Sequence, residues 1–118
     1  MGLFTDKILT ALKENGRKQE PLRGTKGEID FKPVVKIFTP DAGATWLLTE
    51  IHPEEADIAF GLCDLGMGFP ELGSVRISEL EAVRGALGLP AERDLGFHAK
   101  KLISEYATEA RQHGGIRA

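Results

Sequence analysis

The centre of the chain contains four short segments with the composition of β-strands, separated by brief turns. They are rich in β-branched and aromatic residues and read VVKIFT (34–39), ATWLLTEI (44–51), DIAFGLCDL (57–65) and GSVRI (73–77). Pro33 and Pro40 bound the first segment. Because turns recur about every 8 to 12 residues, the pattern predicts an antiparallel meander.

A short amphipathic helix is predicted before these strands. Thr5 has the character of an N-cap, Gly16 offers a left-handed stop, and the apolar positions with helical spacing are Phe4, Ile8, Leu9 and Leu12. Residues 17–32 (RKQEPLRGTKGEIDFK) then become polar and contain glycines. We interpret residues 17–32 as an exposed loop, whose basic side chains are diluted by acidic ones.

Two more helices are predicted after the strands. Ser78 and Glu81 have the spacing of a capping box, which predicts a helix that ends at Gly88. Ser104 is a predicted cap for a last helix, and residues 94–98 are a candidate edge strand. The prediction is therefore an α+β fold, in which an antiparallel meander sheet of four to five strands is combined with an N-terminal helix, a helix after the sheet and a C-terminal helix.

Alternation along the second predicted strand places apolar groups on both of its faces. One face carries Thr45, Leu47, Thr49 and Ile51, and the other carries Ala44, Trp46, Leu48 and Glu50. The third strand is also apolar on both faces, so both strands are predicted to be central and covered on two sides. We expect helices to cover one face, and loops, a partner or a second copy of the chain to cover the other.

Length and composition set broad limits. At 118 residues the chain is predicted to be a single domain, residues 1–118. The formal net charge is −3, which argues against a nucleic-acid binder that uses a broad basic surface. No stretch resembles a signal peptide or a membrane span, and no membrane association is expected. A single cysteine, Cys63, excludes an internal disulfide and favours a reducing compartment, so we predict a cytoplasmic location.

The stretch FGLCDLGMGFPELG (60–73) resembles a phosphate-binding loop only in part. Gly66 and Gly68 match two glycines of a dinucleotide fingerprint, but Glu71 stands where the third belongs and a strand follows. We interpret the stretch as a β–β connection whose glycines have positive φ. Its residues Gly66, Met67, Gly68, Phe69 and Glu71 remain candidates for a binding site.

Cys63 has two interpretations. In the first, Cys63 is a nucleophile that Asp64 and a nearby His52 assist. In the second, Cys63 is a small core residue beside Gly61, and the two small residues leave room for a packed helix. The core interpretation is favoured, because free cysteine is among the most buried residue types.

The turn IHPEEAD brings together side chains that can bind a divalent metal. His52, Glu54 and Asp57 are the candidate ligands, and Asp64 is a further carboxylate. Their spacing matches no defined metal motif, and a solvated acidic turn is the alternative. Asp64 lies too far along its strand to share an ion with this turn. No cofactor is predicted.

Trp46 also has two interpretations. With Lys36 and Phe38 of the neighbouring strand it would form an aromatic and basic platform for single-stranded nucleic acid. A lone tryptophan in a small protein more often anchors the core, and Leu48 shares its face, so the core is favoured.

Residues 34–97 resemble a bacterial family of unknown function. The matching blocks are VVKIFTP, ATWLLTE, FGLCDLGMGFPELG and SELE. The resemblance implies short proteins carried on plasmids and integrative conjugative elements, some of which are described as single-stranded DNA endonucleases. It implies no catalytic residues.

Two functional hypotheses follow. The first is a non-catalytic protein-binding module of a mobile element, which docks on a host or element protein; inhibition of a host defence complex is one form of this. The alternative is a single-stranded DNA-binding protein or a metal-dependent endonuclease. A homodimer is a third hypothesis. Acidity and the lack of a catalytic motif favour the first, although no catalytic residue is assigned or excluded.

Overall fold

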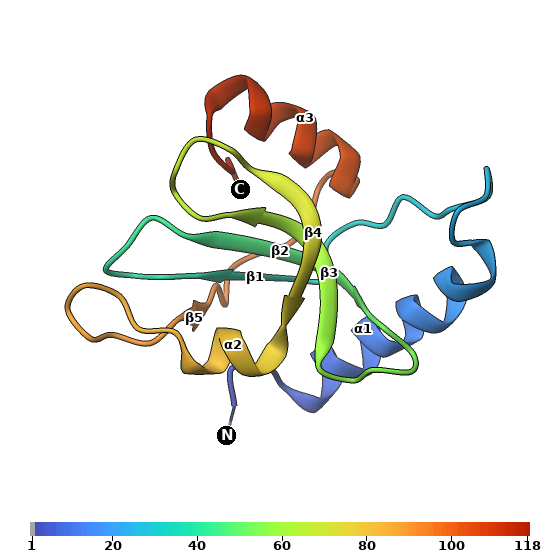
Figure 1. Ribbon diagram of the computed structural model, residues 1–118, viewed down its shortest axis with the longest axis horizontal. Coiled ribbons are helices and arrows are strands. Elements are labelled where there is room, and N and C mark those ends of the chain that lie inside the picture. The colour runs from blue at the N-terminus through green and yellow to red at the C-terminus, as the bar shows by residue number, and fades with distance from the viewer. Residues whose placement is uncertain (1) are drawn as a thin grey trace.

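The computed structural model describes residues 2–118, in which a five-stranded antiparallel sheet has helices on both faces (Figure 1). The sheet has the strand order β4-β3-β2-β1-β5, so β1 to β4 form the predicted meander and β5 pairs with the outer side of β1. The α+β prediction is confirmed. The elements are α1 (Asp6–Gln19), the short 3-10 helix η1 (Glu20–Leu22), β1 (Val35–Phe38), β2 (Thr45–Ile51), β3 (Ile58–Asp64), β4 (Glu71–Arg76), α2 (Ile77–Ala82), β5 (Glu92–Arg93) and α3 (Ile103–His113).

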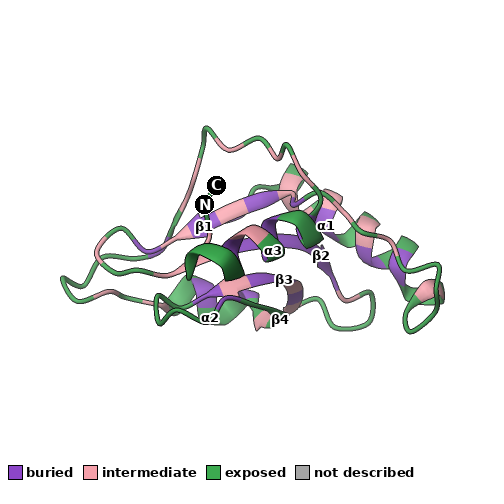
Figure 2. Cartoon of the chain, turned by 90° about the horizontal axis from the view of Figure 1, so that it is seen from above, coloured by how far each residue is buried: buried purple, intermediate pink, exposed green. Residues whose placement is uncertain are grey.

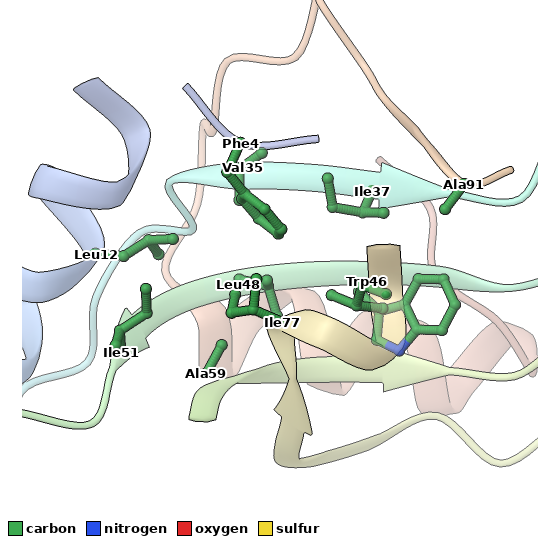
Figure 3. Close-up of a cluster of buried hydrophobic side chains, with 11 residues drawn as sticks. Phe4, Leu12, Val35, Ile37, Trp46, Leu48, Ile51, Ala59, Ile77 and Ala91 are labelled. Atoms are coloured by element: carbon green, nitrogen blue, oxygen red, sulfur yellow. The ribbon is translucent and has the colours of Figure 1, made fainter. Parts of the chain in front are cut away.

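The sheet separates two apolar clusters. On one face, Trp46 and Leu48 of β2 pack with residues of β1, α1 and α2 (Figure 3). On the other face, Leu47 and Leu62 pack with buried side chains of α3. The second face is also covered by the loop residues Phe97 and Ala99 and by Ile116 after α3. The expected loop cover is therefore present, and α3 is the part of the cover that we had not expected on this face. The buried positions concentrate on the strands, whereas the connecting loops are largely exposed (Figure 2).

The first helix is longer than predicted, because Gly16 has a different role from a helix stop. A Cβ atom at Gly16 would lie 1.8 Å from the carbonyl oxygen of Ile51, so this glycine lets α1 approach the backbone of β2. The helix continues to Gln19 and is followed by η1. Residues 17–22 of the predicted loop are therefore helical.

The helices α2 and α3 are capped by residues distant in the sequence. Asp57 accepts hydrogen bonds from the backbone N–H of Ser78 (2.9 Å) and from its hydroxyl (2.7 Å). Asp30 accepts the same pair of hydrogen bonds from Ser104. Both serines are the second residue of their helix rather than the predicted caps.

The predicted end of α2 at Gly88 is wrong, since α2 ends at Ala82. The predicted strand 94–98 is also wrong, since β5 is Glu92–Arg93.

A β-bulge interrupts the pairing of β2 with β3. Leu48 pairs with Gly61 and Glu50 pairs with Phe60, which leaves Thr49 as an extra residue. The bulge reverses the alternation that the sequence predicts. Ile51 joins the cluster of Trp46, and Glu50 shares the α3 face with its partner Phe60.

Gly61 makes this close strand pairing possible. A Cβ atom at Gly61 would lie 2.0 Å from the carbonyl oxygen of Leu47, so the missing side chain leaves room for β2. The expectation that it leaves room for a helix is wrong. Gly73 is paired with Gly61 on β4, and a Cβ at Gly73 would meet nothing within 4 Å. The two glycines face each other across one strand pair but differ in the space around them.

We expect Gly61→Ala to lower the free energy of unfolding by about 1–3 kcal/mol or more, because β2 must move to relieve the overlap. Gly73→Ala is the matched control and should be neutral or slightly stabilising, since glycine weakens a strand interior. Urea unfolding of both variants checks this. Equal effects at the two positions would contradict the assignment of Gly61 to close strand contact.

A second prediction concerns the pH dependence of stability. Burial raises the pKa of Glu50 above its ordinary value of 4.5, and the Arg23 guanidinium offsets part of this shift. Between the unfolded and folded pKa values the folded chain binds more protons than the unfolded chain. The contribution of Glu50 to the free energy of unfolding is therefore fully present below the unfolded pKa. It is lost as the pH rises through the folded pKa.

Glutamine at this position does not titrate. We therefore expect the stability of Glu50→Gln relative to wild type to increase from about pH 4 to about pH 7, as measured by chemical unfolding at each pH. The comparison with wild type cancels the other carboxylates. A relative stability that is flat or decreases over this range would contradict the prediction.

Candidate functional site

Three loops meet at one end of the sheet, which we call the loop end. They are the β1–β2 turn (39–44), the β3–β4 loop (65–70) and the segment 83–91 that follows α2, and they lie together at the left of Figure 1. Asp41 in the first loop accepts hydrogen bonds from the backbone N–H groups of Leu87 (2.7 Å) and Leu89 (3.2 Å). The first and third loops are thereby held together.

The β3–β4 loop has the backbone that its glycines predict. Gly66 has φ +81° and Gly68 has φ +85°, so the expectation of positive φ is confirmed. Asp64 begins the loop by accepting a hydrogen bond from the N–H of Gly66 at 2.8 Å. Its other oxygen accepts a hydrogen bond from the N–H of Ile116 at 2.9 Å, so this carboxylate organises two segments of backbone.

Large apolar side chains project from these loops into solvent. Met67 is 69% exposed, and Phe69 and Leu87 are each 80% exposed. We refer to these three side chains and Leu65, all of which lie at the loop end, as the apolar loop surface. The segments 65–70 and 85–91 contain no charged residue, and Glu71 lies just beyond the first of them, on β4. Exposed Met and Phe side chains on a loop without charged residues are typical of the centre of a protein interface.

Lys36 and Trp46 do not form the predicted platform. Trp46 is buried in the cluster of Figure 3, which confirms its interpretation as a core residue. Lys36 pairs with Leu47 and so lies on the opposite face of the sheet, where its ammonium group contacts Asp94 at 3.3 Å. The sheet separates the two side chains, so the proposed stacking site for nucleic acid is wrong.

The candidate metal ligands are divided between the two ends of β3. Asp57 precedes the strand and Asp64 ends it, as expected from the sequence. Hydrogen bonds from Ser78, with a smaller effect of Arg76, lower the pKa of Asp57. His52 accepts a hydrogen bond from the N–H of Glu54 at 3.1 Å. Among residues 2–118, no three His, Cys, Asp or Glu side chains are placed to hold one metal ion.

Cys63 is half-buried and packs against the cluster that contains Trp46. Trp46 is also the residue of β2 with which Cys63 pairs in the sheet. Burial raises the pKa of its thiol, which disfavours the nucleophilic thiolate. His52 follows Ile51 at the other end of β2, so the pairing of Cys63 with His52 is wrong. The interpretation of Cys63 as a packing residue agrees with its position.

Sequence reasoning missed two features. Leu87 falls within the helix that was predicted to end at Gly88, whereas it lies in a loop and is exposed. The sequence LGLP contains the glycine and proline that indicate a loop. Glu50 was placed on the wrong face, although a carboxylate within an apolar central strand is itself an unusual signal.

The two glycines of the β3–β4 loop should differ in sensitivity. Alanine at either position is strained by positive φ, but only at Gly66 would the Cβ meet backbone, 2.9 Å from the carbonyl oxygen of Gly43. We expect Gly68→Ala to lower the free energy of unfolding by about 1 kcal/mol and Gly66→Ala to lower it by more. Thermal and urea unfolding measure both. A larger loss of stability for Gly68→Ala than for Gly66→Ala would contradict the contact of Gly66 with Gly43.

Comparisons with known proteins identify one family. The family model described as "Protein of unknown function (DUF2958)" matches residues 3–117. No curated protein and no solved structure matches the chain significantly. In residues 2–118 we find no helix of the length and apolar character needed to cross a membrane. The chain belongs to the DUF2958 family.

Proposed function

We propose that the protein is a non-catalytic protein-binding module that docks on a partner protein through the apolar loop surface. The observation that carries this proposal is the exposure of Met67 and Phe69 on a loop that has no charged residue. Burying such side chains against a partner is favourable by about 25 cal/mol for each Å² of apolar surface removed from water. Aromatic and methionine side chains are also enriched at interface centres.

The positioning of the loops supports this proposal. Asp41 ties the segment 83–91 to the β1–β2 turn, and Gly43 of that turn lies against Gly66 of the β3–β4 loop. A surface whose backbone is already held in place loses less conformational entropy when it binds. The partner should present an apolar recess of its own to Met67 and Phe69.

The setting that we propose follows from the family resemblance of residues 34–97. The protein acts in the cytoplasm as an accessory factor of a mobile genetic element, and its partner is a protein of the host or of the element. One form of this activity is the inhibition of a host defence complex. The bulged sheet then serves as a scaffold that presents the loop end.

Capture from a bacterial host lysate, followed by mass spectrometry and by direct binding of the purified partner, tests the proposal. We expect the double variant Met67→Asp/Phe69→Asp to lose the partner, because carboxylates would have to be desolvated at the interface centre. Leu102→Asp is the control, since this leucine is also partly exposed but precedes α3. Circular dichroism confirms that the variants are folded.

Three outcomes would contradict this function. The first is partner binding by the double variant with wild-type affinity. The second is a dimer that the double variant dissociates, which would make a second copy of the chain the occupant of the surface. The third is cleavage of single-stranded DNA by the purified protein in magnesium or manganese, which would favour the nuclease hypothesis.

A further inference from the structure

A cavity of about 220 Å³ opens on the α3 face of the sheet, at the end opposite the loops. Its lining includes segment 28–31, the start of α3, and Thr49 and Glu50 of β2. Drug-sized ligands occupy pockets of about 300–1,000 Å³, so this cavity is too small for a nucleotide and suits one side chain or a small molecule.

Glu50 is the buried charged residue in the lining of the cavity. It is only 3% exposed, and the bulge at Thr49 is what turns it toward this face. One carboxylate oxygen lies 3.4 Å from the Arg23 guanidinium, and the other lies 3.4 Å from the Thr49 hydroxyl. The Gln19 side chain also interacts with this carboxylate. The contacts with Arg23 and Thr49 are at the outer limit of hydrogen bonding, so a donor that comes closer would make a stronger bond.

The surroundings of Glu50 favour a ligand with an apolar stem and a cationic head. Phe31, Phe60 and Ile103 contribute apolar surface to the cavity. Glu28 and Asp30 line it as well and make the local charge more negative. A cation that enters along this apolar wall gains both the burial of its stem and a charge-assisted hydrogen bond at its head.

Arg23 already places a guanidinium at this carboxylate. Its side chain is 40% exposed and also contacts Glu20, so it approaches Glu50 from solvent. The guanidinium is partly solvated and its contact with the buried carboxylate is long, so a cation that makes a shorter contact can displace it. The chain therefore supplies its own weakly held cation where an external one can bind.

We propose that this cavity binds a guanidinium or primary ammonium group carried on a short apolar stem, with the cationic head on Glu50 and in competition with Arg23. The ligand is either a free amine or a single arginine or lysine side chain of a peptide. Because this site lies at the other end of β2 from the apolar loop surface, the inference goes beyond the proposed function and does not depend on it.

Titration of the intact protein, followed by calorimetry and by amide chemical shifts, tests the site. The free probes are agmatine and n-butylamine, with n-butanol as the uncharged control, and the peptide probe is a short peptide with one internal arginine. We expect the charged probes to bind and n-butanol to bind at least tenfold more weakly. Binding of agmatine without the peptide identifies a free amine as the ligand, and binding of the peptide with higher affinity identifies a side chain.

Two variants make the test specific. Glu50→Gln keeps the shape of the side chain and should lower the affinity for the charged probes at least tenfold. Arg23→Gln, once circular dichroism shows that it is folded, should bind the same probes several-fold more tightly, because the internal competitor is gone. The double variant Met67→Asp/Phe69→Asp should bind them as wild type does.

The proposal is overturned if neither wild type nor Arg23→Gln binds any charged probe. It is equally overturned if Glu50→Gln binds the probes as tightly as wild type. Loss of agmatine binding in the Met67→Asp/Phe69→Asp variant would place the ligand at the loop end and would also overturn it. Failure of the proposed docking function, in contrast, leaves all of these measurements unchanged.

Discussion

The close pairing of β2 with β3 is the contact on which the rest of the structure depends. These strands lie at the centre of the sheet, and Gly61 allows them to approach where a side chain would overlap the backbone of Leu47. The bulge at Thr49 lies beside this point and decides which side chains face each helix layer. The cluster under α1 and α2, the cluster under α3 and the orientation of Glu50 all follow from this local geometry.

Much of the fold is predictable from the sequence because strand composition and turn spacing are local signals. The four strands between residues 34 and 77 are found within one or two residues of their predicted ends. The face assignments fail at Thr49, because alternation assumes an uninterrupted ladder and a bulge leaves no clear signal in the residues themselves. Gly16 was misread for a related reason, since a glycine that permits close approach looks in the sequence like one that ends a helix.

The candidate sites were predictable to a lesser degree, because they depend on contacts between distant segments. The positive φ angles of Gly66 and Gly68 follow from the loop sequence itself. Leu87 lies at the same end of the sheet as Met67 because Asp41 accepts hydrogen bonds from segment 83–91. These hydrogen bonds join residues that are more than forty positions apart in the sequence. The cavity at Glu50 requires the bulge, segment 28–31 and α3 together. No pattern within a single segment contains this information.

The remote caps of α2 and α3 have a consequence for how the molecule folds and opens. A helix of six residues such as α2 is far too short to persist in water on its own. Its first turn is completed by Asp57, which comes from the segment that leads into β3, and α3 is completed in the same way by Asp30. Each helix therefore depends on a distant segment for part of its terminal hydrogen bonding, in addition to the local bonds that Glu79 and Glu105 accept. Displacement of either distant segment would remove hydrogen bonds from the helix that it caps, so local opening of the segment and fraying of the helix are coupled.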